Sequence, residues 1–280
     1  MTEVSRAAEL LRAGELVAFP TETVYGLGAD ASNPRAVARI FAAKGRPADH
    51  PLIVHLPDAA HLPRWAIDIP ATALKLAAAF WPGPLTLILR RHPSVSDAIT
   101  GGQNTVGLRV PNHPLALQLL REFDGGVAAP SANRFGHVSP TTAAHVREEL
   151  GTSVALILDG GPCAVGIEST ILDLSGTQAR ILRPGMLDAD AIAGILGAPP
   201  IVGGSQDAPR VSGSLEAHYA PRTPLRLATT DKLGELVRIA LQAGKSVAVL
   251  SAAAPPLTHE CLNWCRAATD ATQFAHDLYA

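Results

Sequence analysis

The sequence has few aromatic residues and no excess of charge of either sign. Aromatic side chains make up 4% of the 280 residues, whereas 47% of the residues are hydrophobic, so the core must consist mainly of aliphatic and alanine side chains. The 23 Lys and Arg residues and the 25 Asp and Glu residues leave a formal net charge of -2. A nucleic acid or another polyanion would therefore have to meet a local basic patch rather than the field of the whole protein.

Cysteines and long apolar runs are also scarce. The 3 cysteines offer no disulfide framework, and no basic segment followed by an apolar one begins the chain, which together predict a cytoplasmic protein. No apolar run approaches the roughly 18 to 20 residues of a membrane span, so no membrane association is expected. Cys261 and Cys265 have no second ligand pair nearby in the sequence, and no metal site built from protein ligands is predicted.

What the chain does contain is a mixture of helix and strand patterns that do not alternate strictly. The helix and strand patterns of residues 1–196 predict an α/β or α+β domain with a twisted mixed β-sheet. Gly, Pro and Ser are frequent in residues 197–224, which is typical of a linker. Residues 225–280 predict a small α/β domain. Its expected elements are a strand at Leu225–Leu227, a helix at Asp231–Leu241, a strand at Ser246–Leu250 and a helix at Asp270–Tyr279.

The stretch Phe19–Pro47 organises the candidate site. It starts at the end of a buried strand and enters a turn rich in hydroxyl groups and glycines. Asn33, followed by a proline, is a typical start of a helix, and Gly45 can adopt the left-handed conformation that ends one. Lys44 and Arg46 therefore flank the end of a predicted helix.

Two interpretations of these cations are open. Lys44 and Arg46 can neutralise the phosphates of a nucleotide, because Arg engages two oxygens at once. They can equally be solvated residues that the helix dipole favours at this end. No GxxxxGK[ST] sequence occurs, so the pattern does not indicate a P-loop NTPase.

Four further clusters carry polar side chains that could reach a ligand. They are Thr21–Thr23 with Tyr25, Ser131–Asn133 with Ser139, Thr105 with Arg109, and Glu168–Thr170 with Arg183. Hydroxyl and amide groups in turns either hold a small polar ligand or only bond the local backbone. Thr105 and Arg109 lie four residues apart on one predicted strand, so their side chains share a face, which either lines a polar cavity or is exposed.

Six motifs in this order resemble one family. They are PTETVYGLG, KGRPADHPLIVH, TVGLRVPNHP, APSANRFGHVSP, ESTILDL and ILRPG, and together they are similar to the YrdC-like L-threonylcarbamoyl-AMP synthases. The linker sequence HYAPRTPL is similar to that of the two-domain branch of this family. The resemblance implies a YrdC-like fold, in which a twisted mixed sheet with helices curves around a concave basic cavity.

The resemblance also implies a reaction. L-threonine, bicarbonate and ATP, with Mg²⁺ accompanying the ATP, would give threonylcarbamoyl-AMP and pyrophosphate. The product would pass to a tRNA threonylcarbamoyl transferase complex, so direct tRNA binding is not required of this chain. Displacement at the α-phosphorus by a carboxylate needs positioning and charge neutralisation more than a general base, which agrees with the residue types in the motifs.

Positions that match the family's motifs are expected to form two subsites and a lid. The resemblance implies that threonine binds at Thr23, His55, Arg109, Ala129 and Ser169. It implies that ATP binds at Lys44, Arg46, His50, Thr105, Ser131, Asn133, Ser139 and Arg183. His218 and Tyr219 of the linker would close over the cavity and exclude water.

Two departures from the family's pattern stand out. Residues Ser212–Ala217 replace the usual Pro-Gly and basic residues before HYAP, so a lid contact from this part of the linker is not expected. The second domain is expected to be truncated. Two alternatives remain: a relative that forms carbamoyl-AMP, and a module that binds RNA through the basic cavity, which a salt-dependent interaction with tRNA would reveal.

Overall fold

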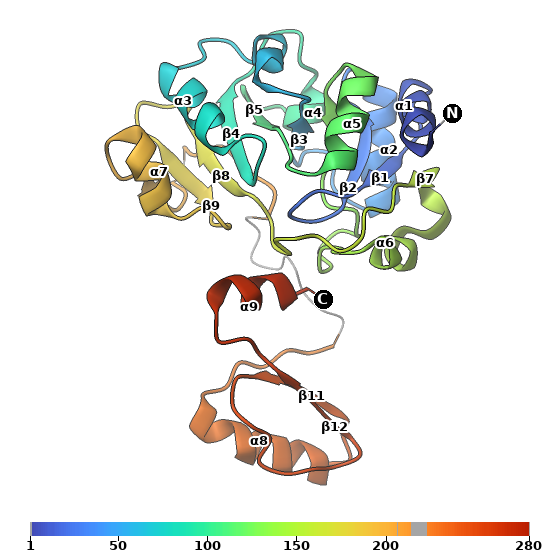
Figure 1. The fold of residues 1–280 in the computed structure, drawn as a ribbon, viewed down its shortest axis with the longest axis vertical. Coiled ribbons are helices and arrows are strands. Elements are labelled where there is room, and N and C mark those ends of the chain that lie inside the picture. Colours follow the sequence, from blue (N-terminus) through green and yellow to red (C-terminus); the bar gives the residue numbers. More distant parts are fainter. Residues whose placement is uncertain (1, 206, 214–222, 280) are drawn as a thin grey trace. The chain divides into compact units, whose positions relative to one another are not determined.

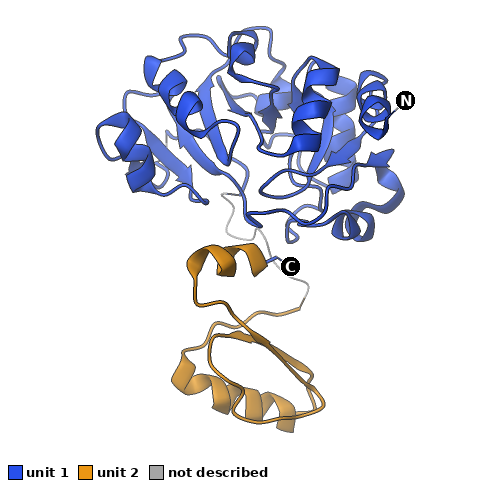
Figure 2. Cartoon of the chain, viewed as in Figure 1, with its two compact units in different colours: residues 1–220, 279 blue, residues 221–278, 280 orange. Residues whose placement is uncertain are grey.

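The computed structural model describes residues 2–205, 207–213 and 223–279, which divide into two compact units (Figures 1 and 2). The first unit spans residues 1–220 with residue 279, and the second comprises residues 221–278 with residue 280. The expected division at residues 196 and 224 remains a prediction. None of the described helices is long and apolar enough to cross a bilayer.

One mixed sheet forms the frame of the first unit. Its strands lie in the order β10-β9-β8-β4-β5-β3-β6-β2-β1-β7. Their bounds are β1 Val17–Phe19, β2 Gly26–Asp30, β3 Ile53–His55, β4 Leu85–Arg90, β5 Thr105–Arg109, β6 Val127–Ala128, β7 Leu156–Ile157, β8 Thr170–Asp173, β9 Arg180–Arg183 and β10 Ile201–Val202. Parallel and antiparallel pairs are both present, so the predicted mixed α/β fold is confirmed.

Helices cover both faces of this sheet. Their bounds are α1 Glu3–Arg12, α2 Pro34–Lys44, α3 Ala71–Phe80, α4 Asp97–Thr100, α5 Pro114–Phe123, α6 Ala143–Leu150 and α7 Ala189–Leu196, with short 3-10 helices at Ala59–Arg64 and Gly151–Ser153. Figure 1 shows α1 and α5 at one end of the unit and α3 and α7 at the other.

Strand β1 shows how the sequence pattern creates the two layers. Val17 and Phe19 pack with the buried faces of α1 and α5, whereas Leu16 and Ala18 belong to the larger core that contains α2. Successive side chains of a strand point to opposite faces, so a run of apolar residues is required when both faces are covered. The core is aliphatic, as the scarcity of aromatic residues predicted.

The sheet places two site residues side by side. β3 runs parallel to β5, with His55 in register with Arg109. β3 also pairs with β6, whose last residue precedes the turn that begins at Ala129. Three segments that are far apart in the sequence therefore reach the site from neighbouring strands.

Strand β2 is the main element of this unit that the sequence pattern did not predict. Residues 26–30 read as part of a glycine-rich turn, yet they pair with β1 and β6. A Cβ atom on Gly28 would lie 2.9 Å from the Phe19 ring and 3.0 Å from a Val127 methyl group. The glycine is therefore needed for close packing in the strand, which sequence propensity cannot reveal.

The second unit is small and has few buried side chains. It contains α8 Thr230–Gln242, β11 Val247–Ser251, β12 Leu262–Arg266 and α9 Ala271–Asp277. The two strands form a parallel pair. The strand predicted at Leu225–Leu227 was wrong, because these residues pair with no strand among the described residues and their leucines are exposed. The strand β12 was not predicted.

Candidate active site

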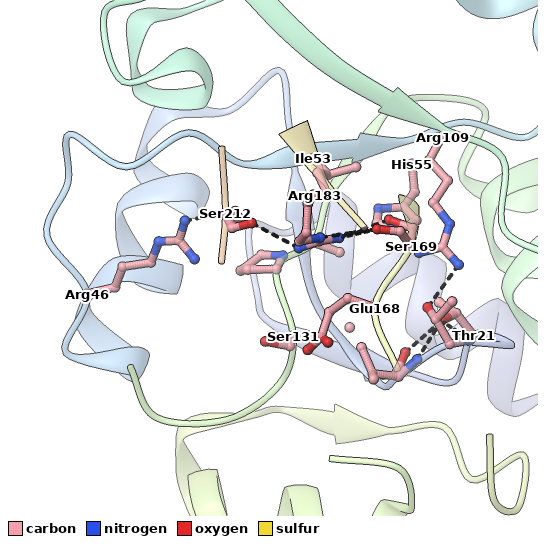
Figure 3. A pocket seen from close by; sticks show the side chains of 15 residues that line it. Thr21, Arg46, Ile53, His55, Arg109, Ser131, Glu168, Ser169, Arg183 and Ser212 are labelled. Carbon is pink, nitrogen blue, oxygen red and sulfur yellow. Dashed lines mark hydrogen bonds between the residues drawn. The ribbon is translucent and has the colours of Figure 1, made fainter. Parts of the chain in front are cut away.

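A polar cavity of about 510 Å³, which includes its opening to solvent, lies in the first unit (Figure 3). Its described lining comes from the turn after β1, from β3 and β5, from the turn after β6, and from residues before β8 and in β9. The lining residues are Thr21, Thr23, Val24, Gly26, Arg46, Ile53, His55, Arg109, Ala129, Pro130, Ser131, Glu168, Ser169, Arg183 and Ser212.

The turn after β1 carries two buried hydroxyl groups, of Thr21 and Thr23, which are hydrogen-bonded to each other at 2.9 Å and differ in their other partners. Thr21 Oγ1 donates to the Val24 carbonyl at 2.6 Å and accepts the N–H groups of Thr23 and Val24. The Thr21 hydroxyl therefore stabilises the turn by bonding the local backbone, which is one of the two roles considered for these hydroxyl groups. The Thr23 hydroxyl instead accepts a hydrogen bond from Arg109 Nη2 at 2.9 Å, so it belongs to the cavity.

Arg109 is held by a carboxylate that the sequence reasoning did not single out as a site residue. Its Nη2 donates to Glu22 Oε1 at 2.6 Å, and Glu22 Oε2 accepts the Asn112 N–H at 2.8 Å. Both members of the pair are buried. A buried charge must be paired and hydrogen-bonded, so Glu22 both neutralises and orients the guanidinium. The only signal in the sequence was an acidic residue between two threonines.

His55 lies beside Arg109 as a neutral imidazole. Burial, followed by the nearby charge of Arg109, lowers the pKa of His55 to about 3. Its ring packs edge-on against Phe19, with the ring centroids 5.9 Å apart. Because Arg109 is also buried, the face that it shares with Thr105 is not simply an exposed sheet surface.

Two arginines line another part of the cavity and share a partner in residues 207–213. Arg46 Nη2 donates to Ser212 Oγ at 3.0 Å and to the Pro51 carbonyl at 2.9 Å. Arg183 Nη1 donates to the Ser212 carbonyl at 3.0 Å, and its other nitrogens reach the carbonyl and hydroxyl of Ser169 (Figure 3). Ser212, the first residue of the segment from which no lid contact is expected, therefore bonds both arginines, because its hydroxyl and its carbonyl oxygen each accept a hydrogen bond.

Lys44 is buried and does not line the cavity. Its Nζ donates to the Ser131 carbonyl at 2.5 Å and to the Asn133 carbonyl at 2.6 Å. Burial, and then the charge of Arg46, holds the pKa of Lys44 well below its usual value. Lys44 therefore ties the end of α2 to the turn that presents Ser131, and it is not a solvated residue at a helix end.

Several other predicted residues surround the cavity without lining it. Asn133 donates its amide N–H groups to backbone carbonyls, and Ser139 donates to Glu168 Oε1 at 2.5 Å. His50 packs edge-on against Phe135, and its pKa is lowered by burial and then by Arg46. Thr105 lines a second, smaller cavity that shares Ile53 and Ser212 with the first.

The structure thus brings eight of the predicted positions into one cavity. These are Thr23, Arg46, His55, Arg109, Ala129, Ser131, Ser169 and Arg183. The remaining described positions, Lys44, His50, Thr105, Asn133 and Ser139, lie outside its lining. His218 and Tyr219 lie outside the described residues. Glu168 and Ser212 also line the cavity. Glu168 belongs to one of the polar clusters found in the sequence but was assigned to neither subsite, and Ser212 was not predicted to contribute.

Comparison with known proteins identifies the family. Residues 9–185 match the Sua5, YciO and YrdC family, described as telomere recombination, and residues 178–280 match the C-terminal domain of threonylcarbamoyl-AMP synthase. The threonylcarbamoyl-AMP synthase of Bacillus subtilis is 44% identical over 255 residues, covering 89% of this chain and 74% of the relative.

The chain belongs to the two-domain threonylcarbamoyl-AMP synthases. The crystal structure of Pyrococcus abyssi Sua5 complexed with L-threonine is 39% identical, with a TM-score of 0.91, and the match covers 100% of this chain and 84% of that one. A putative threonylcarbamoyl-AMP synthase of Mycobacterium tuberculosis is 43% identical over 191 residues, which cover 68% of this chain and 88% of the relative. The family, the fold and the class of nucleotidyltransferase predicted from the motifs are confirmed.

Proposed function

We propose that this chain joins L-threonine, bicarbonate and ATP into threonylcarbamoyl-AMP and pyrophosphate within the described cavity. The observation that carries the proposal is the division of the cavity's cations. Arg109 is paired with a carboxylate beside a hydroxyl cluster, whereas Arg183 donates to the uncharged oxygens of Ser169 and Ser212 in another part of the cavity, which Arg46 also lines. Uncharged partners do not neutralise the guanidinium of Arg183, so its charge can attract a polyanion.

Threonine would bind on the Arg109 side. An arginine offers five N–H donors in a fixed fork, so Arg109 can bind a carboxylate with donors that Glu22 does not use. Thr23 and Ser169 offer hydroxyl groups, Ala129 offers backbone groups, and neutral His55 adds no competing charge. A solved structure of a Pyrococcus abyssi relative contains L-threonine, which supports this assignment.

ATP would bind on the side of Arg46, Ser131 and Arg183. Lys44 would act by fixing the turn that presents Ser131, because its Nζ donates to carbonyls of this turn. Asn133 and Ser139 would also act indirectly, because Asn133 bonds backbone carbonyls and Ser139 bonds Glu168. His50 and Thr105 lie nearby. The carbamate oxygen of carboxylated threonine would then attack the α-phosphorus, and the main contributions of the protein would be alignment and charge neutralisation.

Mg²⁺ would accompany the triphosphate rather than reside in the protein. Asn133 Oδ1 is buried and has no hydrogen-bond partner among the described residues, and an amide oxygen is a ligand that Mg²⁺ accepts. No group of three metal-binding His, Cys, Asp or Glu side chains occurs in the part of the chain that the structure describes. When bound, the ion would neutralise phosphate charge, and Asn133 is the residue that fits it.

Three further predictions complete the proposal. His218 and Tyr219 would close over the cavity and protect a labile mixed anhydride from water. The product would pass to a tRNA threonylcarbamoyl transferase complex, without a need for this chain to bind tRNA. The 3 free cysteines favour a cytoplasmic location.

The direct test is pyrophosphate release from ATP and bicarbonate with and without L-threonine. We expect release to depend on threonine, and release that ignores threonine would contradict the proposal. The variant Arg46→Gln should weaken ATP binding by roughly 10- to 100-fold, because a charge-assisted contact is lost. Its threonine affinity should stay unchanged, which also verifies its fold. Arg35→Gln, an exposed arginine on α2, is the matched control.

A further inference from the structure

The cavity offers many groups for anions and few for a cation. Arg46, Arg109 and Arg183 line it, and the single carboxylate among its described lining residues is that of Glu168. An amino acid enters as a zwitterion, so its ammonium group needs an acceptor once its carboxylate has paired with an arginine. An ionised acceptor makes the stronger hydrogen bond, and Glu168 is the described lining residue that supplies one.

Glu168 is positioned for this role by its neighbours. It directly precedes Ser169, a residue assigned above to the threonine subsite, and its side chain is only partly buried. Ser139 donates its hydroxyl to Glu168 Oε1 at 2.5 Å, and Tyr279 donates its hydroxyl to Glu168 Oε2 at 3.1 Å. These two bonds fix the carboxylate, and each oxygen keeps a lone pair that can accept a further hydrogen bond. Figure 3 shows the Glu168 side chain among the residues of the cavity, between the labelled Ser131 and Thr21 in that view.

We propose that Glu168 binds the ammonium group of threonine and accepts one of its protons when the nitrogen is carboxylated. The inference rests on the binding of threonine in this cavity proposed above. The other charged residues that were assigned above to substrate binding are cationic, so Glu168 would be the acidic residue of the site.

The proton balance requires such an acceptor. Threonine nitrogen is protonated near neutral pH and has no lone pair for attack on carbon. Transfer of one proton to the Glu168 carboxylate gives the free amine. The amine then forms an N–C bond with the carbon of bicarbonate, and the hydroxyl group of bicarbonate leaves with a second N–H proton as water. The product is the carbamate anion, which is the nucleophile for the α-phosphorus.

The test compares two ligands that differ only in the amine. These are L-threonine and the 3-hydroxybutanoate of the same configuration at the hydroxyl carbon, titrated calorimetrically against the full chain and its Glu168→Gln variant. The variant should bind threonine roughly 10- to 100-fold more weakly, whereas its affinity for 3-hydroxybutanoate should be unchanged. Glu148→Gln, at an exposed glutamate on α6, should change neither affinity.

A pH profile separates the proton-acceptor role from binding alone. In Glu168→Gln the amine must lose its proton to solvent, so kcat/KM for threonine should rise about tenfold per pH unit across the neutral range. The unmodified protein should show a shallower rise.

Three results would overturn the proposal. Equal weakening of both ligands would mean that Glu168 only shapes the cavity. Unchanged threonine affinity, with an altered Mg²⁺ requirement, would assign the carboxylate to the metal. Parallel pH profiles of kcat/KM in the unmodified protein and in Glu168→Gln would show that Glu168 does not accept the proton. Failure of the unmodified protein to bind threonine at all would instead contradict the proposed function, so the two failures are distinguishable.

Discussion

At the scale of single residues, the site depends on buried charges whose partners fix their geometry. Arg109 is neutralised by Glu22, whereas the described hydrogen bonds of the Lys44 side chain go to the backbone carbonyls of Ser131 and Asn133. Removing one member of a buried ion pair leaves the other charge unpaired, which typically costs about 3 to 5 kcal/mol. Loss of the Glu22 carboxylate would therefore leave the Arg109 charge unpaired and remove the group that orients its side chain.

His55 gives a pH prediction at this scale. The pKa of His55 is lowered to about 3 in the folded protein, against about 6.5 in the unfolded chain. Its contribution to stability is complete above pH 6.5 and is lost as the pH falls toward 3, because only the unfolded chain takes up the proton. Because the unfolded chain takes up one proton at His55 over this range, the free energy of unfolding should fall by about 2 kcal/mol between pH 7 and pH 5.

Urea unfolding of the unmodified protein and of His55→Asn would check this prediction. Asparagine does not titrate, so the free energy of unfolding of the variant should fall less between these pH values, by about the same 2 kcal/mol. Equal pH dependence in both proteins would show that the imidazole is protonated in the folded state.

At the scale of elements, helix α2 has ends that are defined by its own sequence. The Asn33 side chain accepts the N–H groups of Arg35 and Ala36, and Gly45 ends the helix at φ 62°. Both ends were predicted, because caps and left-handed glycines act through neighbouring residues. The helix thereby delivers Lys44 and Arg46 to the site.

Gly45 carries the prediction for this element. A Cβ atom at this position would meet no atom within 4 Å, so Gly45→Ala tests backbone conformation alone. We expect a loss of about 1 kcal/mol in the free energy of unfolding, because alanine disfavours a positive φ. Gly45→Asn should lose less, since asparagine tolerates this conformation better. Equal losses in the two variants would contradict the conformational explanation.

The strands show the limit of local reasoning. A strand was predicted at Thr105–Val110 from its apolar content, and the structure forms it at Thr105–Arg109. The strand Gly26–Asp30 was not predicted, because its glycines are typical of a turn. Gly28 is explained only by the closeness of Phe19 and Val127, which belong to neighbouring strands. The strand Leu262–Arg266 was missed for a similar reason, since its pairing with Val247–Ser251 is not visible in either segment alone.

At the scale of the molecule, every described residue of the cavity lies between Thr21 and Ser212. The segment 207–213 belongs with the first unit, because Arg210 donates to the Gly101 carbonyl and Ser212 bonds Arg46 and Arg183. The described lining of the cavity therefore lies within residues 1–213.

A fragment of residues 1–213 would test whether this part of the chain binds threonine by itself. It should unfold cooperatively and bind L-threonine with an affinity within about threefold of that of the full chain, since it keeps every described lining residue and loses only Tyr279 of the two residues that donate to Glu168. Calorimetric titration and thermal unfolding would measure both. A fragment ending at residue 209 is the comparison, because it lacks Ser212 and should bind ATP more weakly. Loss of threonine binding in the longer fragment would show that the remaining residues complete the site.

The sequence by itself determined the family, the mixed α/β class, the ends of helix α2 and most of the candidate positions, because motifs, caps and strand alternation are recorded in residues that are close together in the chain. Only the tertiary structure separated Lys44, which bonds the turn, from Arg46, which lines the cavity. Only the tertiary structure brought Glu22 to Arg109 across 87 positions, and Glu168 and Ser212 into the lining. The direction in which a side chain points depends on partners from distant segments, and the sequence does not record which segments meet.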